Sequence, residues 1–130
     1  MISKIEYERI GARIVHASYT VHKELGPGLL ESVYEMCLEE ELKALGLHVE
    51  RQVKLPVIYK GKVLNKEFFI DMLVENVVAI ELKAVEMLMP VHEVQLLTYM
   101  KLADLKLGYL INFNVSIIKL GIKRKINGYL

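Results

Sequence analysis

Apolar residues recur at helical spacing in three stretches of the chain. Over residues 5–25 they follow intervals of three or four, and a Gly-Pro pair ends this pattern. A second apolar stripe begins after Gly28 and continues to about Leu45, where a glycine follows as is common just beyond a helix end. Pro90 suits the first turn of a third helix, which we extend to about Leu105. The pattern therefore predicts two consecutive helices and a later third.

Between the second and third helices the apolar period changes to two, which is typical of strands. A Lys-Gly turn ends the first strand, and Glu75-Asn76 is the shortest link that a hairpin allows. The predicted strands cover residues 48–62, 67–74, 77–84, 108–113 and 117–126. With the helices, this order predicts an α/β fold, on the border of α+β, in which helices flank a mixed central sheet.

Length and composition narrow the class of protein. A chain of 130 residues with 53% hydrophobic residues is expected to form a single domain over residues 1–130. No apolar run approaches the roughly 18 residues of a membrane span. Cys37 is the sole cysteine, so no intrachain disulfide forms and we expect a cytoplasmic protein. The net charge of +1 gives no overall basic character that would indicate nucleic acid. The basic run in "KLGIKRK" is interpreted as a solvated face rather than a phosphate-binding patch.

Three charged residues interrupt the two central apolar strands. Glu81 and Lys83 are two positions apart in "VVAIELKA", so their side chains share one face of the strand. The tight link places Asp71 of the preceding strand roughly opposite residue 80 or 81. Burying these three charged groups without partners would cost roughly several kcal/mol. The fold must therefore offset their charge in some way.

Two kinds of compensation fit these three charges. The first is a structural ion pair, in which Lys83 neutralises Asp71 or Glu81. The second is a divalent cation, because two carboxylates are hard oxygen ligands of the kind that suits Mg²⁺ or Mn²⁺. In that case Lys83 would orient or deprotonate the attacking water and offset charge on a phosphorane-like transition state. Two acids and one base leave the net negative charge that a cation requires.

Residues on two helices extend this candidate site. Glu31, in the first turn of the second helix, lies beside the core-facing Tyr34 and is expected to lean toward the sheet, although a first-turn acid also complements the helix dipole. His92, Gln95 and Tyr99 share one face of the third helix, and they could hold a water or a phosphate oxygen by hydrogen bonds. For His92 a polar boundary position is an equally good interpretation. The remaining histidines lack metal-ligand spacing, and no zinc site is expected.

These motifs together resemble a known family. The segment "GLLESVY" from Gly28 to Tyr34 reads G-x-x-E-x-x-Y, and Asp71 is followed by E-L-K and then by Q-x3-Y. In this order they resemble the small bacterial and archaeal GxxExxY family of the PD-(D/E)XK nuclease superfamily. The resemblance covers nearly the whole chain, roughly from the first helix through "GYLINFN". The proline that gives the superfamily its name is Ile70 here, and proline is no ligand.

The resemblance implies a restriction-endonuclease-like core and a set of residue roles. Asp71 and Glu81 would bind Mg²⁺ or Mn²⁺, Lys83 would assist the attacking water, and Glu31 would complete the metal site. Gln95 would be a further catalytic residue, and Tyr99 would support the site or contact the substrate strand. The expected activity is hydrolysis of nucleic acid, with DNA as the expected substrate.

Two other functions remain open at this point. A catalytically silent module of the same fold would bind nucleic acid or a protein partner, which the near-neutral net charge favours. A structural protein with a buried ion network is the third, although Glu31 and Glu81 would then compete for one cation. A homodimer with facing clefts would double the basic surface, and the apolar segment "EMLMPV" would mark either its interface or the core.

Overall fold

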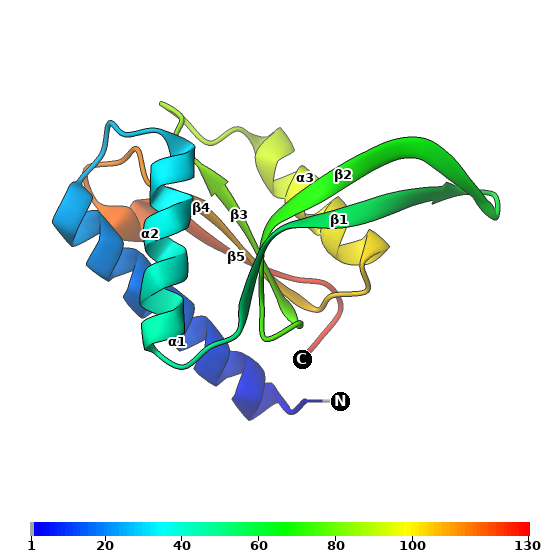
Figure 1. The fold of residues 1–130 in the computed structure, drawn as a ribbon, viewed down its shortest axis with the longest axis horizontal. Coiled ribbons are helices and arrows are strands. Elements are labelled where there is room, and N and C mark those ends of the chain that lie inside the picture. Colours follow the sequence, from blue (N-terminus) through cyan, green and yellow to red (C-terminus); the bar gives the residue numbers. More distant parts are fainter. Residues whose placement is uncertain (1) are drawn as a thin grey trace.

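The computed structural model describes residues 2–130 as five strands, three α-helices and a short 3-10 helix (Figure 1). In chain order they are α1 (Lys4–Leu25), α2 (Glu31–Ala44), β1 (Val49–Tyr59), β2 (Lys62–Val74), β3 (Val78–Lys83), α3 (Pro90–Leu102), β4 (Leu107–Asn112), η1 (Ile118–Gly121) and β5 (Ile122–Ile126). Among these residues, no helix combines the length and apolar character needed to cross a membrane.

The five strands form one mixed sheet in the order β1-β2-β3-β4-β5. All neighbouring strands are antiparallel except β3 and β4, which run parallel because α3 connects them as a crossover. Every residue of β4 is buried, as is typical of a strand covered on both faces. The predicted mixed sheet with flanking helices is confirmed.

Alternate side chains of β3 enter two separate cores. Val78, Ile80 and Leu82 pack with the buried faces of α1 and α2. Ala79 packs with Leu96 and other residues of α3 on the opposite face of the sheet. The sheet therefore lies between a layer of two helices and a layer of one helix (Figure 1).

Local signals explain where the helices begin and end. Ser3 accepts a hydrogen bond from the backbone N–H of Glu6 and caps α1. The predicted third helix is too long by three residues, because α3 ends at Leu102 rather than at residue 105. Asp104 adopts a left-handed conformation with φ of 54°. The N–H of Leu105 then bonds to the carbonyl of Met100, as in a Schellman motif.

The C-terminal strand is also shorter than predicted. Residues 118–121 form the 3-10 helix η1, and β5 begins only at Ile122. Gly121 packs so closely against the backbone carbonyl of Asn112 that a Cβ atom there would collide with it. This close approach of two backbones replaces strand pairing at the start of the segment.

Strands β1 and β2 continue beyond the body of the protein as a curved hairpin (Figure 1). The expected second strand began at residue 67, but β2 begins at Lys62 and pairs with β1 from there to Val74. Lys60 and Gly61 form the turn, both at positive φ. We call residues 54–69, which lie between the paired ends Lys54 and Phe69, the hairpin arm.

Candidate active site

Asp71 and Glu81 lie where β2 and β3 part. The two strands pair from Val74 and Val78 to Met72 and Ile80, so the next two residues along the ladder are Asp71 and Glu81. There the backbone N–H of Asp71 donates to Oε1 of Glu81 over 3.1 Å, and the N–H of Leu82 donates to Oδ2 of Asp71 over 2.8 Å. Side-chain carboxylates thus replace the backbone ladder, and they agree with the register predicted from the short link.

Burial makes the charge of Glu81 electrostatically costly. Glu81 is only 7% exposed, and burial together with the nearby charge of Asp71 raises the pKa of Glu81 to about 8. The hydrogen bond from the backbone N–H of Asp71 and the charge of Lys83 oppose this rise. The raised pKa means that burial, together with the charge of Asp71, disfavours the charged form of Glu81.

Lys83 follows Glu81 on the same face of β3, and it is partly buried. Within residues 2–130 it forms no ion pair with any carboxylate. Its charge nevertheless lowers the pKa values of Glu31 and Glu81, so it lies near the site without being held by one acid. The alternative of a structural ion pair centred on Lys83 is therefore wrong.

The first two turns of α2 bring further acids toward Asp71. Burial and the charge of Asp71 raise the pKa of Glu31, while Lys83 lowers it. Burial also raises the pKa of Glu35, against a hydrogen bond from Gln52. The Gln52 amide donates to Glu35 over 3.0 Å and to Asp71 over 3.3 Å, and so connects α2 to the site.

Glu35 and Gln52 are site residues that the sequence analysis missed. Glu35 follows Glu31 by one helical turn, and this spacing was a usable signal. Gln52 adopts a φ of 52°, and it lies across from Asp71 at a position where the β1–β2 ladder skips a pair. No property of its sequence neighbours predicts that irregularity.

A divalent cation suits the charge of this site. Asp71 and Glu81 offer hard oxygen ligands without a paired base, and Mg²⁺ is commonly held by one or two carboxylates with water completing its shell. Among residues 2–130, no three acidic, histidine or cysteine side chains are grouped closely enough to hold a metal ion by themselves. The residues therefore fit a cation held by the carboxylates of Asp71 and Glu81, with Glu31 at the margin of the site.

The polar residues of α3 form contacts of their own. Gln95 donates to the Tyr99 hydroxyl over 2.9 Å, and the Tyr99 ring lies against Phe68 of β2 with centroids 5.5 Å apart. Nδ1 of His92 accepts a hydrogen bond from the N–H of Met89, so His92 caps the start of α3. Within the described part of the chain, no hydrogen bond joins these side chains to Asp71, Glu81 or Lys83.

Tyr34 is a buried residue of the protein core. Its side chain is fully buried, and its ring stacks on Phe113 with centroids 4.7 Å apart. The hydroxyl donates to the carbonyl of Gly26 over 2.6 Å and accepts from the N–H of Leu29 over 3.2 Å. The G-x-x-E-x-x-Y segment therefore closes the loop between α1 and α2 and fixes where Glu31 begins the second helix.

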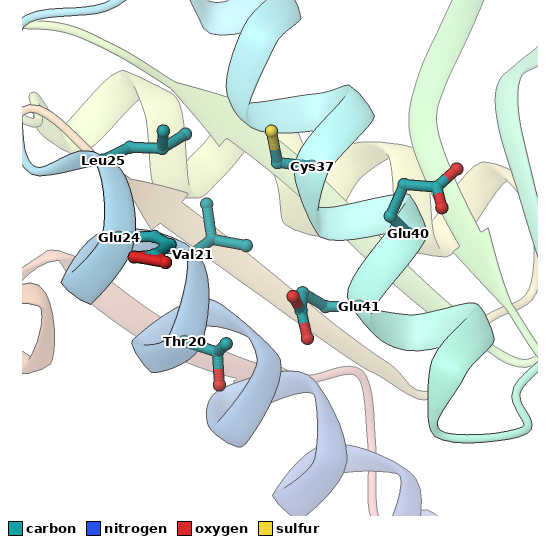
Figure 2. A pocket seen from close by; sticks show the side chains of 7 residues that line it. All are labelled: Thr20, Val21, Glu24, Leu25, Cys37, Glu40 and Glu41. Carbon is teal, nitrogen blue, oxygen red and sulfur yellow. The ribbon is translucent and has the colours of Figure 1, made fainter.

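A separate cavity of about 170 Å³ lies between α1 and α2 (Figure 2). Its lining residues are Thr20, Val21, Glu24, Leu25, Cys37, Glu40 and Glu41. It contains none of the predicted site residues. Three carboxylates around an apolar floor would repel a phosphate group, so the carboxylate pair at the end of β3 is the better candidate for the active site.

Most of the segment "EMLMPV" lies at the surface. Met87, Met89 and Val91 are exposed, so an assignment of these residues to the core is wrong. Met87 and Met89 lie in the loop that connects β3 to α3, and Val91 lies in the first turn of α3, whereas Leu88 of the same loop is partly buried against the core on the α3 side of the sheet.

Comparison with known families bears on the whole site. A family model described as the PD-(D/E)XK nuclease superfamily matches residues 8–125, which include every candidate residue. The chain belongs to this superfamily. Searches of curated proteins and of solved structures found no match.

Membership in the PD-(D/E)XK superfamily gives the site its chemical context. The superfamily consists of nucleases, which bind nucleic acid and generally use divalent metals. The sheet and helices agree with its restriction-endonuclease-like α/β fold, which confirms the fold that the resemblance implies.

Proposed function

We propose that this protein is a metal-dependent nuclease of the GxxExxY type that hydrolyses phosphodiester bonds in nucleic acid, with DNA as its substrate. One observation carries the proposal: Lys83 is free of ion pairs among the described residues, near the partly buried Asp71 and the buried Glu81, whose pKa is raised to about 8. A structural ion cluster would pair Lys83 with a carboxylate, whereas here Lys83 lies near two carboxyl groups without an ion pair to either.

In this proposal Asp71 and Glu81 hold Mg²⁺ or Mn²⁺, with Glu31 at the margin of the site. A cation held there would supply Lewis-acid chemistry, polarising a phosphate oxygen and lowering the pKa of a water. Lys83 orients the attacking water and offsets the charge that develops on the phosphate in the transition state. Gln95 and Tyr99 position the strand from α3. Tyr34 and His92 support the site by fixing α2 and α3.

The direct test is cleavage of labelled single- and double-stranded DNA and RNA with Mg²⁺ or Mn²⁺. The wild type should cut, and Glu81→Ala should not. Glu40→Ala is the matched control, because it removes an exposed acid of α2 that lines the cavity of Figure 2. Circular dichroism and thermal unfolding should show that both variants fold. Cutting by Glu81→Ala at the wild-type rate would overturn the proposal.

A second function is a nuclease fold that binds nucleic acid without cutting it. The observation that favours it is that residues 2–130 contain no group of three ligands able to hold a metal alone. Binding that persists in EDTA, with no turnover in Mg²⁺ or Mn²⁺ for any of the four substrates, would decide for this function.

Exposed apolar residues support a homodimer as part of the proposal. Met87, Met89, Val91 and Val94 are each exposed, in the loop before α3 and in its first turns. Single charged substitutions there, such as Val91→Glu, should shift the protein from dimer to monomer in analytical ultracentrifugation. A wild-type protein that sediments as a monomer at every concentration would exclude the dimer.

A further inference from the structure

The hairpin arm concentrates positive charge on an otherwise acidic chain. Its 16 residues contain four lysines and one glutamate. The arm therefore has a net charge of +3, and since the whole chain has +1, the other residues together have −2. The near-neutral total conceals this separation of charge.

The arm lysines are also more available than the other basic cluster. Lys54 pairs with Glu67 across the arm. Lys60, Lys62 and Lys66 form no ion pair within residues 2–130. The basic run on β5 differs, because two of its members contact acids of the helices: Arg124 contacts Glu8 over 3.2 Å, and Lys125 contacts Glu93.

Aromatic side chains alternate with these lysines. The strand register places Tyr59 opposite Lys62 and Phe69 opposite Lys54. Tyr59 is 60% exposed and Phe69 is 45% exposed. Lys60 lies over the Tyr59 ring, with its nitrogen 5.4 Å from the centroid. Exposed rings next to unpaired cations are the combination with which proteins bind single-stranded nucleic acid, because the rings stack on bases and the cations contact phosphates.

The arm leads directly to the carboxylate pair. Strand β2 begins at Lys62 in the arm and carries Asp71 nine residues later. An extended strand rises about 3.3 Å per residue, so the path is at most about 30 Å long. At the base of the arm, Gln52 of the paired strand contacts Asp71. A nucleic-acid strand lying along the arm would therefore reach Asp71 and Glu81.

We propose that the hairpin arm binds a single strand of nucleic acid and guides it into the carboxylate site. This inference rests on the proposed function for the identity of the partner. Exposed apolar side chains at the tip, such as Ile58 and Val63, favour a single strand over a duplex, because their only apolar partners in nucleic acid are bases, which a duplex buries. Two arms of two copies would repel each other, which argues against edge pairing between copies.

The test is binding of a labelled oligothymidine measured by fluorescence anisotropy in EDTA, where metal-dependent cleavage is absent. The arm variant combines Lys60→Gln, Lys62→Gln and Lys66→Gln. The control variant combines Lys4→Gln, Lys23→Gln and Lys119→Gln, which removes the same charge from exposed lysines of α1 and η1. All of these lysines are exposed, so both proteins should unfold at nearly the wild-type temperature.

We expect the arm variant to bind at least about tenfold more weakly, with the slope of log K against log salt reduced by about 2, since each lost phosphate contact removes about 0.7 for a single strand. The control variant should bind nearly as the wild type does. Equal binding by the arm variant and the wild type would overturn the inference. A matched duplex that binds more tightly than the single strand would overturn the choice of strand.

A second pair of variants tests the aromatic part. Tyr59→Ala should weaken binding about fivefold or more, because stacking on a base is lost, whereas Tyr59→Phe should keep it. Tyr19→Ala removes a comparably exposed ring from α1 and should have no effect. Equal effects of Tyr59→Ala and Tyr19→Ala would contradict a stacking role.

The binding experiments on the arm can fail or succeed independently of the cleavage test of the proposed function. If the wild type cuts but the arm variant binds normally, the arm inference fails and the nuclease stands. If nothing is cut but the arm variant loses binding, the nuclease fails, and the arm belongs to a domain that only binds.

Discussion

Strand β3 and the hairpin arm both belong to one sheet, yet they use charge in opposite ways. On β3 five of six residues are buried, including Glu81, and acid there is present without a neutralising partner. On the arm most residues are exposed, and lysines there lie in water beside aromatic rings. Strand β2 connects the two regions, since it carries Lys62 and Lys66 at one end and Asp71 near the other.

This difference indicates that the two regions have separate roles. The charged form of the buried Glu81 has a desolvation cost that a bound cation or a proton would relieve, so this region is suited to chemistry. An exposed basic strand costs the fold almost nothing, so it is suited to holding a partner. Variants of the carboxylate site should therefore leave binding intact, and variants of the arm should leave the chemical step intact.

The largest effects should come from exchanging single groups of the carboxylate site. Asp71→Asn should abolish both cleavage and tight Mn²⁺ binding. Lys83→Gln should slow cleavage by about 100-fold or more, as for loss of a positioned acid or base, without weakening Mn²⁺ binding, because it removes a competing positive charge. Calorimetric titration with Mn²⁺ beside a cleavage assay would show this contrast. Weaker Mn²⁺ binding by Lys83→Gln would contradict the assigned roles.

Next in size is the pH dependence of stability in the absence of metal. The pKa of Glu81 is about 8 in the folded protein and 4.5 ordinarily, so between these values the folded state holds a proton that the unfolded state releases. The contribution of Glu81 to the free energy of unfolding should therefore be greatest below pH 4.5. It should fall as the pH rises toward 8, by up to about 1.4 kcal/mol per pH unit.

Glu81→Gln should lack this contribution. Urea unfolding of the wild type and the variant in EDTA, at pH 5.5 and pH 8.5, isolates it, because Glu31 and Glu35 titrate in both proteins. The same loss of stability in the two proteins would show that Glu81 is not the group responsible.

A smaller effect should follow from loss of the Tyr34 hydroxyl. Tyr34→Phe keeps the stack on Phe113 but leaves the Gly26 carbonyl and the Leu29 N–H without their partner. The free energy of unfolding should fall by about 1 to 3 kcal/mol, measured by urea titration. Cleavage below the unfolding temperature should be unchanged. Loss of cleavage in a variant of normal stability would place Tyr34 in the chemistry instead.

The smallest effect should come from His92. Because Nδ1 of His92 caps α3, His92→Ala should cost about 1 kcal/mol in stability, in the range of other lost helix caps. Thermal unfolding measures this cost. Cleavage at the wild-type rate would agree with a capping role, whereas a loss of cleavage that exceeds the loss of stability would contradict it.

Much of this architecture follows from the sequence because its signals are local. Apolar periodicity gives the helices, and the short link between β2 and β3 gives the register that opposes Asp71 and Glu81. The same alternation places Glu81 and Lys83 on one face. Their placement is predictable because a two-residue period determines it.

Other features depend on contacts distant in sequence. The capping role of His92 and the loop closure by Tyr34 need partners whose positions periodicity does not give. Gln52 reaches Asp71 only because β1 is irregular there. The start of β2 was predicted five residues too late because residues 62–66 are all exposed, including Val63 and Leu64, so they lack the buried alternation that identifies a strand.

The most direct test of these separate roles measures kcat and KM for cleavage of one labelled single strand by three proteins. Relative to the wild type, Glu81→Ala should lose kcat while its binding in EDTA is unchanged. The variant with Lys60→Gln, Lys62→Gln and Lys66→Gln should keep kcat and raise KM. An arm variant with reduced kcat at unchanged KM would contradict the separation of chemistry from binding, and so would cleavage by Glu81→Ala.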